Sequence, residues 1–319
     1  MAFTVFREMK PLQQLILSAF VVIVCFLLFM TVSLIVAIPI FGMETVMNVP
    51  FVTGFDDPAV INMLKYFQIV QSFGLFIVPP IILGWLFYGN FIEYLYLNKT
   101  IIASSVCIVA VLMVSASPLI NFIGELNAGM DLPDWMSGVE QWMKASEEKA
   151  TKLTEAFLDV KTYRGLLLNL FMIAVLPAFG EEFLFRGIIQ RIFTRITRNV
   201  NWGIWISAIL FSAMHMQFYG FVPRMLLGAL FGYLLVWSGS LWIPVIAHFI
   251  NNGIAIVAAF YINQHKLSPY IEEIGSTHNT YYLTVISFIF VTALLVFFRK
   301  QNSKQSLSRN SQLTVDSLQ

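Results

Sequence analysis

Charged residues interrupt an apolar run in the middle of the sequence. Most residues between Leu166 and Ile189 are apolar, yet the run contains Glu181, Glu182 and Arg186. A charged side chain in bilayer hydrocarbon costs at least about 2.5–3.5 kcal/mol, so such groups are usually paired or functional. Helical spacing makes Glu182 and Arg186 neighbours at i and i+4, which predicts an ion pair. Glu181 points about 100° away around the helix and has no local partner, so it is available for chemistry.

Two of the four histidines, His215 and His248, also lie in apolar stretches, and Asn252 follows His248 by four residues. One such histidine alone could serve packing, but two together with an unpaired Glu181 favour a site. A carboxylate and an imidazole in one cavity suit the activation of water for attack on a carbonyl. His248 and Asn252 share one helix face and can both donate hydrogen bonds toward an oxyanion. The pattern therefore suits amide hydrolysis.

The composition places these residues in a membrane. Hydrophobic residues make up 58% of the 319 residues and charged residues 12%, whereas a soluble domain has about 25% charged residues. We therefore expect an integral membrane protein with an all-α fold, a polytopic helix bundle. A spanning helix needs roughly 20 apolar residues. About eight candidate stretches are present, at 15–41, 62–89, 100–123, 164–191, 202–218, 222–238, 241–262 and 280–298. Pro177 and Gly180 predict a kinked or locally unwound helix just before Glu181.

The sequence divides into five parts. The N-terminal membrane helices occupy 1–123, the segment with the candidate site occupies 164–262, and an outer loop with the last membrane helix occupies 263–301. Between the first two lies a polar insert, 124–163, whose apolar residues recur at helical spacing. It is either an amphipathic helix at the membrane interface or a solvated helix packed on the bundle. The tail 302–319 is rich in Ser, Gln and Asn and is expected to be disordered.

The distribution of charge sets the orientation and limits the partners. With the N-terminus in the cytoplasm, nearly all Lys and Arg residues of the short connections lie inside, and so does the C-terminus. A net charge of +1 gives no indication of a nucleic-acid partner. The expected partners are the lipid bilayer and a peptide or membrane-protein substrate. The sequence does not specify an oligomeric state.

Three short motifs follow one another in this segment: E-E-x-x-x-R at 181–186, F-x-x-x-H at 211–215 and H-x-x-x-N at 248–252. In this order they resemble the CPBP (Abi) family, which contains the type II CAAX prenyl endopeptidases and many bacterial relatives. The resemblance covers about residues 164–262 and implies an intramembrane protease, here in a bacterial inner (plasma) membrane. It implies that Glu181 is the general base, that His215 orients the water, and that His248 and Asn252 form the oxyanion hole. Glu182 and Arg186 would hold the Glu181 segment in place.

Two alternatives remain at this point. In the first, Glu181, His215 and His248 bind a catalytic Zn²⁺, because two histidines and a glutamate with an open position suit that metal. The H-E-x-x-H motif is absent and asparagine is a poor zinc ligand, so a mechanism without a cofactor is favoured. In the second, the protein is not an enzyme but a proton-coupled transporter or an immunity or scaffold factor. Intramembrane ionisable groups also mark proton-coupled transport, although no inverted repeat is visible. Whether a substrate is prenylated cannot be read from the residues.

Overall fold

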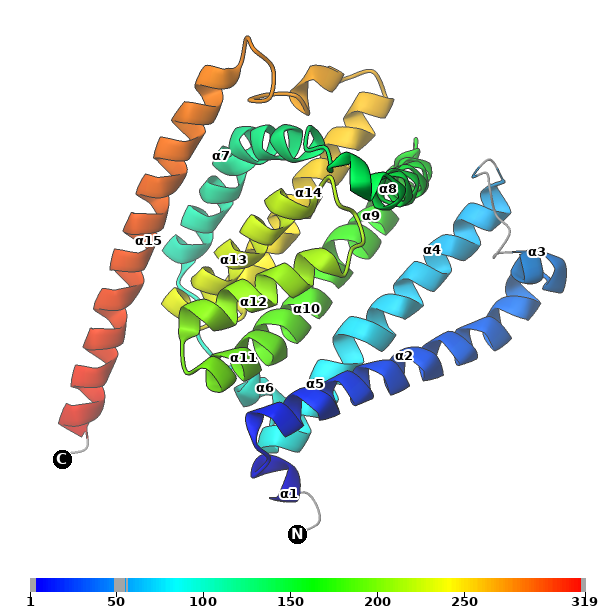
Figure 1. The fold of residues 1–319 in the computed structure, drawn as a ribbon. Coiled ribbons are helices and arrows are strands. Elements are labelled where there is room, and N and C mark those ends of the chain that lie inside the picture. The colour runs from blue at the N-terminus through cyan, green and yellow to red at the C-terminus, as the bar shows by residue number, and fades with distance from the viewer. Residues whose placement is uncertain (1–3, 49–54, 56, 317–319) are drawn as a thin grey trace.

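The computed structural model describes residues 4–48, 55 and 57–316, and these form helices and turns without strands. The predicted all-α class is therefore confirmed. Within the described residues, seven helical segments are long and apolar enough to cross a membrane (Figure 1). They are Pro11–Phe41 (α2), Pro58–Tyr88 (α4, η2 and α5), Ala103–Ala128 (α7), Tyr163–Thr197 (α9 to α11), Phe221–Ser238 (α13), Trp242–Asn263 (α14) and Tyr281–Ser303, the first part of α15.

The fifth of the eight predicted spans, 202–218, is a shorter helix. Helix α12 runs from Val200 to Ala213, which is 14 residues. At 1.5 Å per residue it is about 21 Å long, less than the roughly 30 Å of bilayer hydrocarbon. The helix ends because Met216, three residues later, adopts a left-handed conformation with φ of 53°. His215 consequently lies in a turn beyond α12. The sequence had instead suggested that it lies on the helix.

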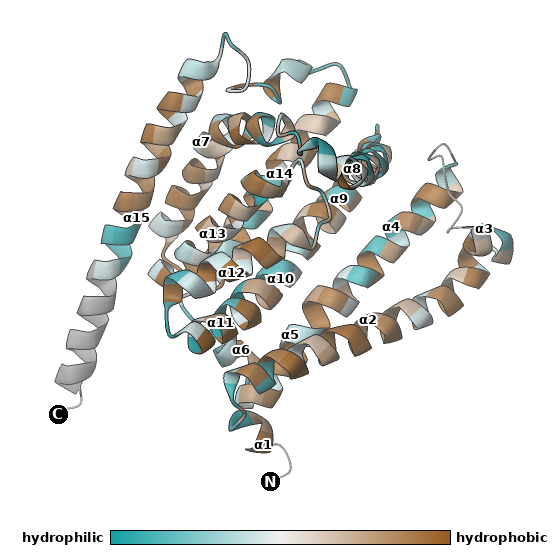
Figure 2. Ribbon diagram, viewed as in Figure 1, coloured by the Kyte–Doolittle hydropathy of each residue, from teal (hydrophilic) through white to brown (hydrophobic). Residues whose placement is uncertain are grey.

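The outward surface of the bundle is apolar, as expected for contact with lipid. Large apolar side chains of α2 and α15 are exposed, among them Ile16, Phe20, Ile286 and Ile289. Figure 2 shows α2 and the coloured part of α15 mostly in brown, with the hydrophilic colours more frequent in the turns and on α8 (Ser137–Leu158). An exposed apolar surface of this kind would aggregate in water but is stable in hydrocarbon. The protein is an integral membrane protein.

The segment Tyr163–Thr197 is central to the bundle. It consists of α9 (Tyr163–Asn169), the π-helical turns η4 (Leu170–Val175), α10 (Leu176–Glu182), the π-helical turns η5 (Phe183–Ile189) and α11 (Gln190–Thr197). Every residue from Gly180 to Ile188 is buried. The predicted kink at Pro177 and Gly180 takes the form of these π turns, and the helix is not unwound. Gly180 instead allows close packing, since a Cβ there would lie 2.6 Å from the Cβ of Phe76.

The polar insert packs on the bundle as a single long helix. Helix α7 continues to Ala128, and α8 then covers Ser137–Leu158. The Trp142 ring lies 5.3 Å from that of Phe218, in the turn after α12. At its other end, α8 is held by Lys65 of α4, which is 6% exposed. Both ends of α8 are therefore in contact with the bundle.

The contact with Lys65 involves the last turn of α8. The Lys65 ammonium donates to the Phe157 carbonyl at 3.0 Å and to Oδ1 of Asn169 at 3.2 Å. Asn169 also donates to the Phe157 carbonyl, at 2.7 Å. The final carbonyls of a helix lack helical donors and carry partial negative charge, so a cation there is stabilising. Helices α4, α8 and α9 are joined at this point.

The polar tail departs from its prediction. Helix α15 extends from Tyr281 to Asp316, so residues 302–316 continue the last membrane helix; residues 317–319 lie outside the described part. A helix already nucleated in the membrane propagates at little cost. The tail contains no Gly or Pro that would end it. The low hydrophobicity that predicted disorder therefore did not determine the backbone conformation.

Candidate functional site

The first component of the site is a buried ion pair. Nη1 of Arg186 lies 2.9 Å from Oε1 of Glu182, and the two residues are 2% and 0% exposed. The guanidinium also donates to the Gly228 carbonyl of α13 at 3.0 Å. The Phe211 ring lies 4.6 Å from its central carbon. The pair predicted from spacing is therefore present, and it also joins η5 to α13 and α12.

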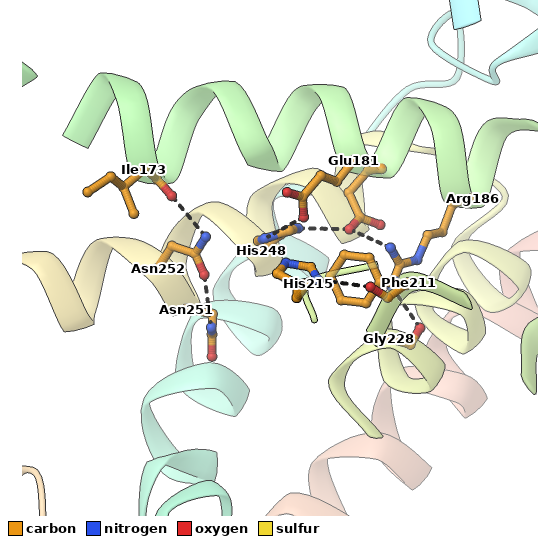
Figure 3. Close-up of polar contacts among 10 residues, drawn as sticks. Ile173, Glu181, Arg186, Phe211, His215, Gly228, His248, Asn251 and Asn252 are labelled. Atoms are coloured by element: carbon orange, nitrogen blue, oxygen red, sulfur yellow. Dashed lines mark hydrogen bonds and ion pairs between the residues drawn. The ribbon is translucent and has the colours of Figure 1, made fainter. Parts of the chain in front are cut away.

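Both carboxylates face His248 of α14 (Figure 3). Nδ1 of His248 donates to Oε1 of Glu182 at 2.8 Å, while its Nε2 lies 3.8 Å from Oε2 of Glu181. The Phe231 ring stacks on the imidazole at 5.3 Å. Because a carboxylate only accepts, this contact places a proton on Nδ1. In neutral His248 the nitrogen that faces Glu181 would then carry a lone pair.

His215 approaches the cluster from the turn after α12. Its Nδ1 lies 2.9 Å from the Phe211 carbonyl, which can only accept, so Nδ1 carries the proton. The Phe211 ring lies 5.1 Å from the His215 ring and 6.1 Å from that of His248. Nε2 of His215 is left as an acceptor in the neutral tautomer. The structure thus brings Glu181, His215 and His248 together around Phe211 (Figure 3).

Asn252 lies one turn from His248 on α14, but its amide is directed elsewhere. Its Nδ2 donates to the Ile173 carbonyl at 2.9 Å, and its Oδ1 accepts from Asn251 at 3.1 Å. Pro177 has no N–H to donate to Ile173, four residues earlier, so that carbonyl lacks its α-helical donor. Figure 3 shows Asn252 turned to Ile173, away from Arg186. In this arrangement the asparagine supports the backbone before Glu181.

The zinc alternative requires three ligands around one point. Among the described residues, no group of three His, Cys, Asp or Glu side chains is placed to hold a metal ion. In His248, the Nδ1 is bonded to Glu182, and in His215 the Nδ1 is bonded to a backbone carbonyl. These bonds leave Nε2 of both histidines with a lone pair, the arrangement in which neighbouring groups also hold histidines that bind metals.

Sequence reasoning did not predict the contacts of the aromatic and glycine residues that complete the site, although Phe211 belongs to the F-x-x-x-H motif. Phe211 and Phe231 contact Arg186 and His248 and enclose the charges. Gly228 and Gly232 form a G-x-x-x-G step, a pattern that permits close packing of helices. A Cβ on Gly228 would lie 3.2 Å from the Phe211 ring, and the carbonyls of the two glycines accept from Arg186 and Gln190. The G-x-x-x-G step was the sequence feature from which this close packing of α13 could be predicted.

Comparison with known proteins agrees with the three motifs. The model of the family described as "Type II CAAX prenyl endopeptidase Rce1-like" matches residues 163–254. The uncharacterized protein YpbD of Bacillus subtilis (strain 168) is 31% identical over 90 residues. That alignment covers 27% of this chain and 43% of YpbD, so the chain spans under half the length of this curated relative. No solved structure matches the chain. The predicted resemblance is confirmed: over residues 163–254, which include the whole carboxylate–histidine cluster, the chain is similar to the Rce1-like type II CAAX prenyl endopeptidases.

Proposed function

We propose that this protein is an intramembrane endopeptidase, in which Glu181 activates water to hydrolyse a peptide bond of a membrane-associated substrate. One observation carries the proposal: two adjacent buried carboxylates have different partners. Glu182 is bonded to Arg186 and His248, whereas Glu181 is not ion-paired to any Lys or Arg among the described residues. The 3.8 Å between Glu181 and His248 exceeds a hydrogen bond. Glu181 therefore retains its capacity to accept a proton.

The reaction begins with a water molecule between the substrate carbonyl and Glu181. The carboxylate takes one proton, and the oxygen attacks the carbonyl carbon to form a tetrahedral oxyanion. The protonated Glu181 then gives that proton to the leaving amine, which breaks the C–N bond. Nε2 of His215, with its lone pair, serves as a second acceptor that orients the water. Positioned general-base catalysis of this kind contributes about 10²–10⁴-fold.

Stabilisation of the oxyanion falls to α14. His248 donates through Nδ1 to Glu182, so donation from Nε2 requires the imidazolium, which the two carboxylates would flank. Asn252 has two hydrogens on Nδ2, and one is donated to Ile173. The second hydrogen is the one proposed to reach the oxyanion. A preorganised donor of this kind acts most strongly in a site that excludes water.

The substrate class is proposed from the family match. A prenylated peptide with a C-terminal CAAX sequence is the substrate to test first. The proposed setting is a bacterial plasma membrane with both termini in the cytoplasm, since the short α12 also turns the chain back and the two termini lie at the same end of the bundle (Figure 1). Purified protein in liposomes would be incubated with a farnesylated peptide, and the products would be identified by mass spectrometry. Cleavage is expected with the wild-type protein and not with Glu181→Gln, which keeps the size but removes the base. Glu155→Gln, on the exposed face of α8, is the control and should cleave normally.

Two outcomes would contradict this proposal. Turnover by Glu181→Gln close to that of the control would remove the role of Glu181. Stoichiometric zinc in the active protein, with reversible loss of activity on chelation, would replace the mechanism with a metal-dependent one.

A further inference from the structure

Arg224, in the first turn of α13, lies outside the three motifs. Its Nη2 donates to Oε1 of Gln217 at 2.9 Å and its Nη1 to the Gln217 carbonyl at 3.3 Å. The guanidinium lies against Gly220, where a Cβ would be 2.9 Å from Nη2. Unlike Arg186, it has no carboxylate within 4 Å in the described part of the chain. A half-buried guanidinium with donors left over is a site for a planar anion.

The helix geometry places Arg224 level with Glu181. Arg186 contacts α13 at Gly228, and Arg224 is four residues before Gly228, so about 6 Å along the axis and on the same face. Glu181 precedes Arg186 by five residues, or about 7.5 Å in its own helix. The step from Gly228 to Arg224 and the step from Arg186 to Glu181 both lead toward the end of the bundle that carries α8. This follows because α11 and α13 each end at the opposite side (Figure 1).

The surroundings of Arg224 connect it with the site. Gly228 faces Phe211 and Ala208 of α12, so Arg224 is on the face of α13 that looks toward His215. The Arg224 guanidinium is bonded to Gln217, two residues after His215 in the same turn. Glu147 of α8 accepts at 3.4 Å from the N–H of Tyr219, in the same turn as Gln217. The guanidinium therefore lies against the turn 214–220, which also carries His215.

We propose that Arg224, with Gln217, binds the free C-terminal carboxylate of the peptide substrate and so sets the distance from the C-terminus to the cleaved bond. This inference rests on the proposed function. A CAAX sequence ends three residues after its modified cysteine, and three extended residues span at most about 10–11 Å. A carboxylate held beside the cluster at the level of Glu181 would thus leave a short C-terminal fragment as the product.

The experiment compares two farnesylated peptides that differ at one group, a C-terminal carboxylate or a C-terminal carboxamide. For the wild-type protein, kcat/KM for the carboxylate peptide should be at least about tenfold higher, because bonds to charged groups are the stronger ones. Arg224→Gln should lower kcat/KM for the carboxylate peptide by a similar factor, through KM, and leave the carboxamide peptide unchanged. Arg164→Gln, at an exposed arginine of α9, is the control and should keep the preference.

Binding gives a second readout that does not depend on turnover. In Glu181→Gln the carboxylate peptide should bind at least about tenfold more tightly than the carboxamide, and adding Arg224→Gln should abolish the difference. Equal losses for both peptides in Arg224→Gln would show that the arginine only neutralises Glu181, and would overturn the inference. Equal kcat/KM values of the wild-type protein for the carboxylate and carboxamide peptides would also overturn the inference. That result is expected if Arg224 bound a lipid phosphate instead of the peptide. Cleavage in Glu181→Gln contradicts the proposed function instead.

Discussion

Replacement of Arg186 by alanine tests the architecture of the site most directly. The substitution removes the partner of Glu182, which is 0% exposed, and the donor to the Gly228 carbonyl. Breaking a buried pair by deleting one partner typically costs about 3–5 kcal/mol, because an uncompensated charge stays buried. We expect a loss of that size in Arg186→Ala. His248 would retain its bond to Glu182, so the loss should not unfold the protein completely.

The expected loss of stability can be measured as a decrease in the melting temperature. At about 2 °C per kcal/mol, the lower end of the range for domains of 150–250 residues, a loss of about 3–5 kcal/mol lowers the Tm by roughly 6–10 °C. The assay is thermal unfolding of purified protein in detergent, with Arg164→Ala as the control. Arg164 is exposed, and surface substitutions usually change stability by less than about 0.5 kcal/mol.

A double variant separates the charge from the packing. In Glu182→Gln with Arg186→Met, no buried charge is left unpaired, and the introduced glutamine side chain still offers an acceptor to His248. Replacing both partners of a buried pair is often close to neutral, so this variant should regain more than half of the lost stability. An Arg186→Ala protein with the Tm of the control would refute the reasoning. A double variant no more stable than Arg186→Ala would show that packing around the guanidinium, not charge, is responsible.

Three further outcomes are expected. Asn252→Ala should lower kcat by roughly 10²–10³-fold if its second N–H reaches the oxyanion, and KM should change little; an unchanged kcat would leave it only the bond to Ile173. Gly180→Ala should destabilise the protein by about 1–3 kcal/mol, as overpacking does, since its Cβ would lie 2.6 Å from Phe76; an unaltered Tm would contradict this. Lys65→Met should make α8 more sensitive to protease, because the Phe157 carbonyl loses a donor; equal cleavage rates would argue against that role.

Local spacing predicted the parts of the site that lie on one helix. The ion pair of Glu182 and Arg186 follows from i, i+4 geometry, and the apolar stretches identified the helices that carry Glu181 and His248. The bond from His248 to Glu182 was not predictable, because 66 residues separate the two and their orientation depends on the packing of α14. The sequence therefore assigned Glu182 to Arg186 alone.

Asn252 is a second residue whose contact could not be predicted from local spacing. Pro177 predicted an irregular helix before Glu181, but nothing local indicated that Asn252, 79 residues from Ile173, would donate to the Ile173 carbonyl. The predicted bounds of the short α12 extended too far because the apolar stretch continues through Met214 and Met216, while the helix ends at Ala213. Hydropathy measures the preference for lipid and not the backbone conformation, which explains this error and the helical tail as well.

The contact between Lys65 and Phe157 has a consequence for biosynthesis. The two residues are 92 positions apart, and ribosomes add about 5–20 residues per second. For roughly 5–18 s after Lys65 is made its carbonyl partner does not exist, and its amide partner Asn169, 104 positions away, is made later still. An unpartnered lysine in hydrocarbon costs about 2.5–3.5 kcal/mol on translocon scales. The helical segment Pro58–Tyr88 should therefore remain weakly inserted, or in contact with the insertion machinery, until α8 and α9 arrive. Maturation of this membrane protein would then be completed late, by the segment that carries the site.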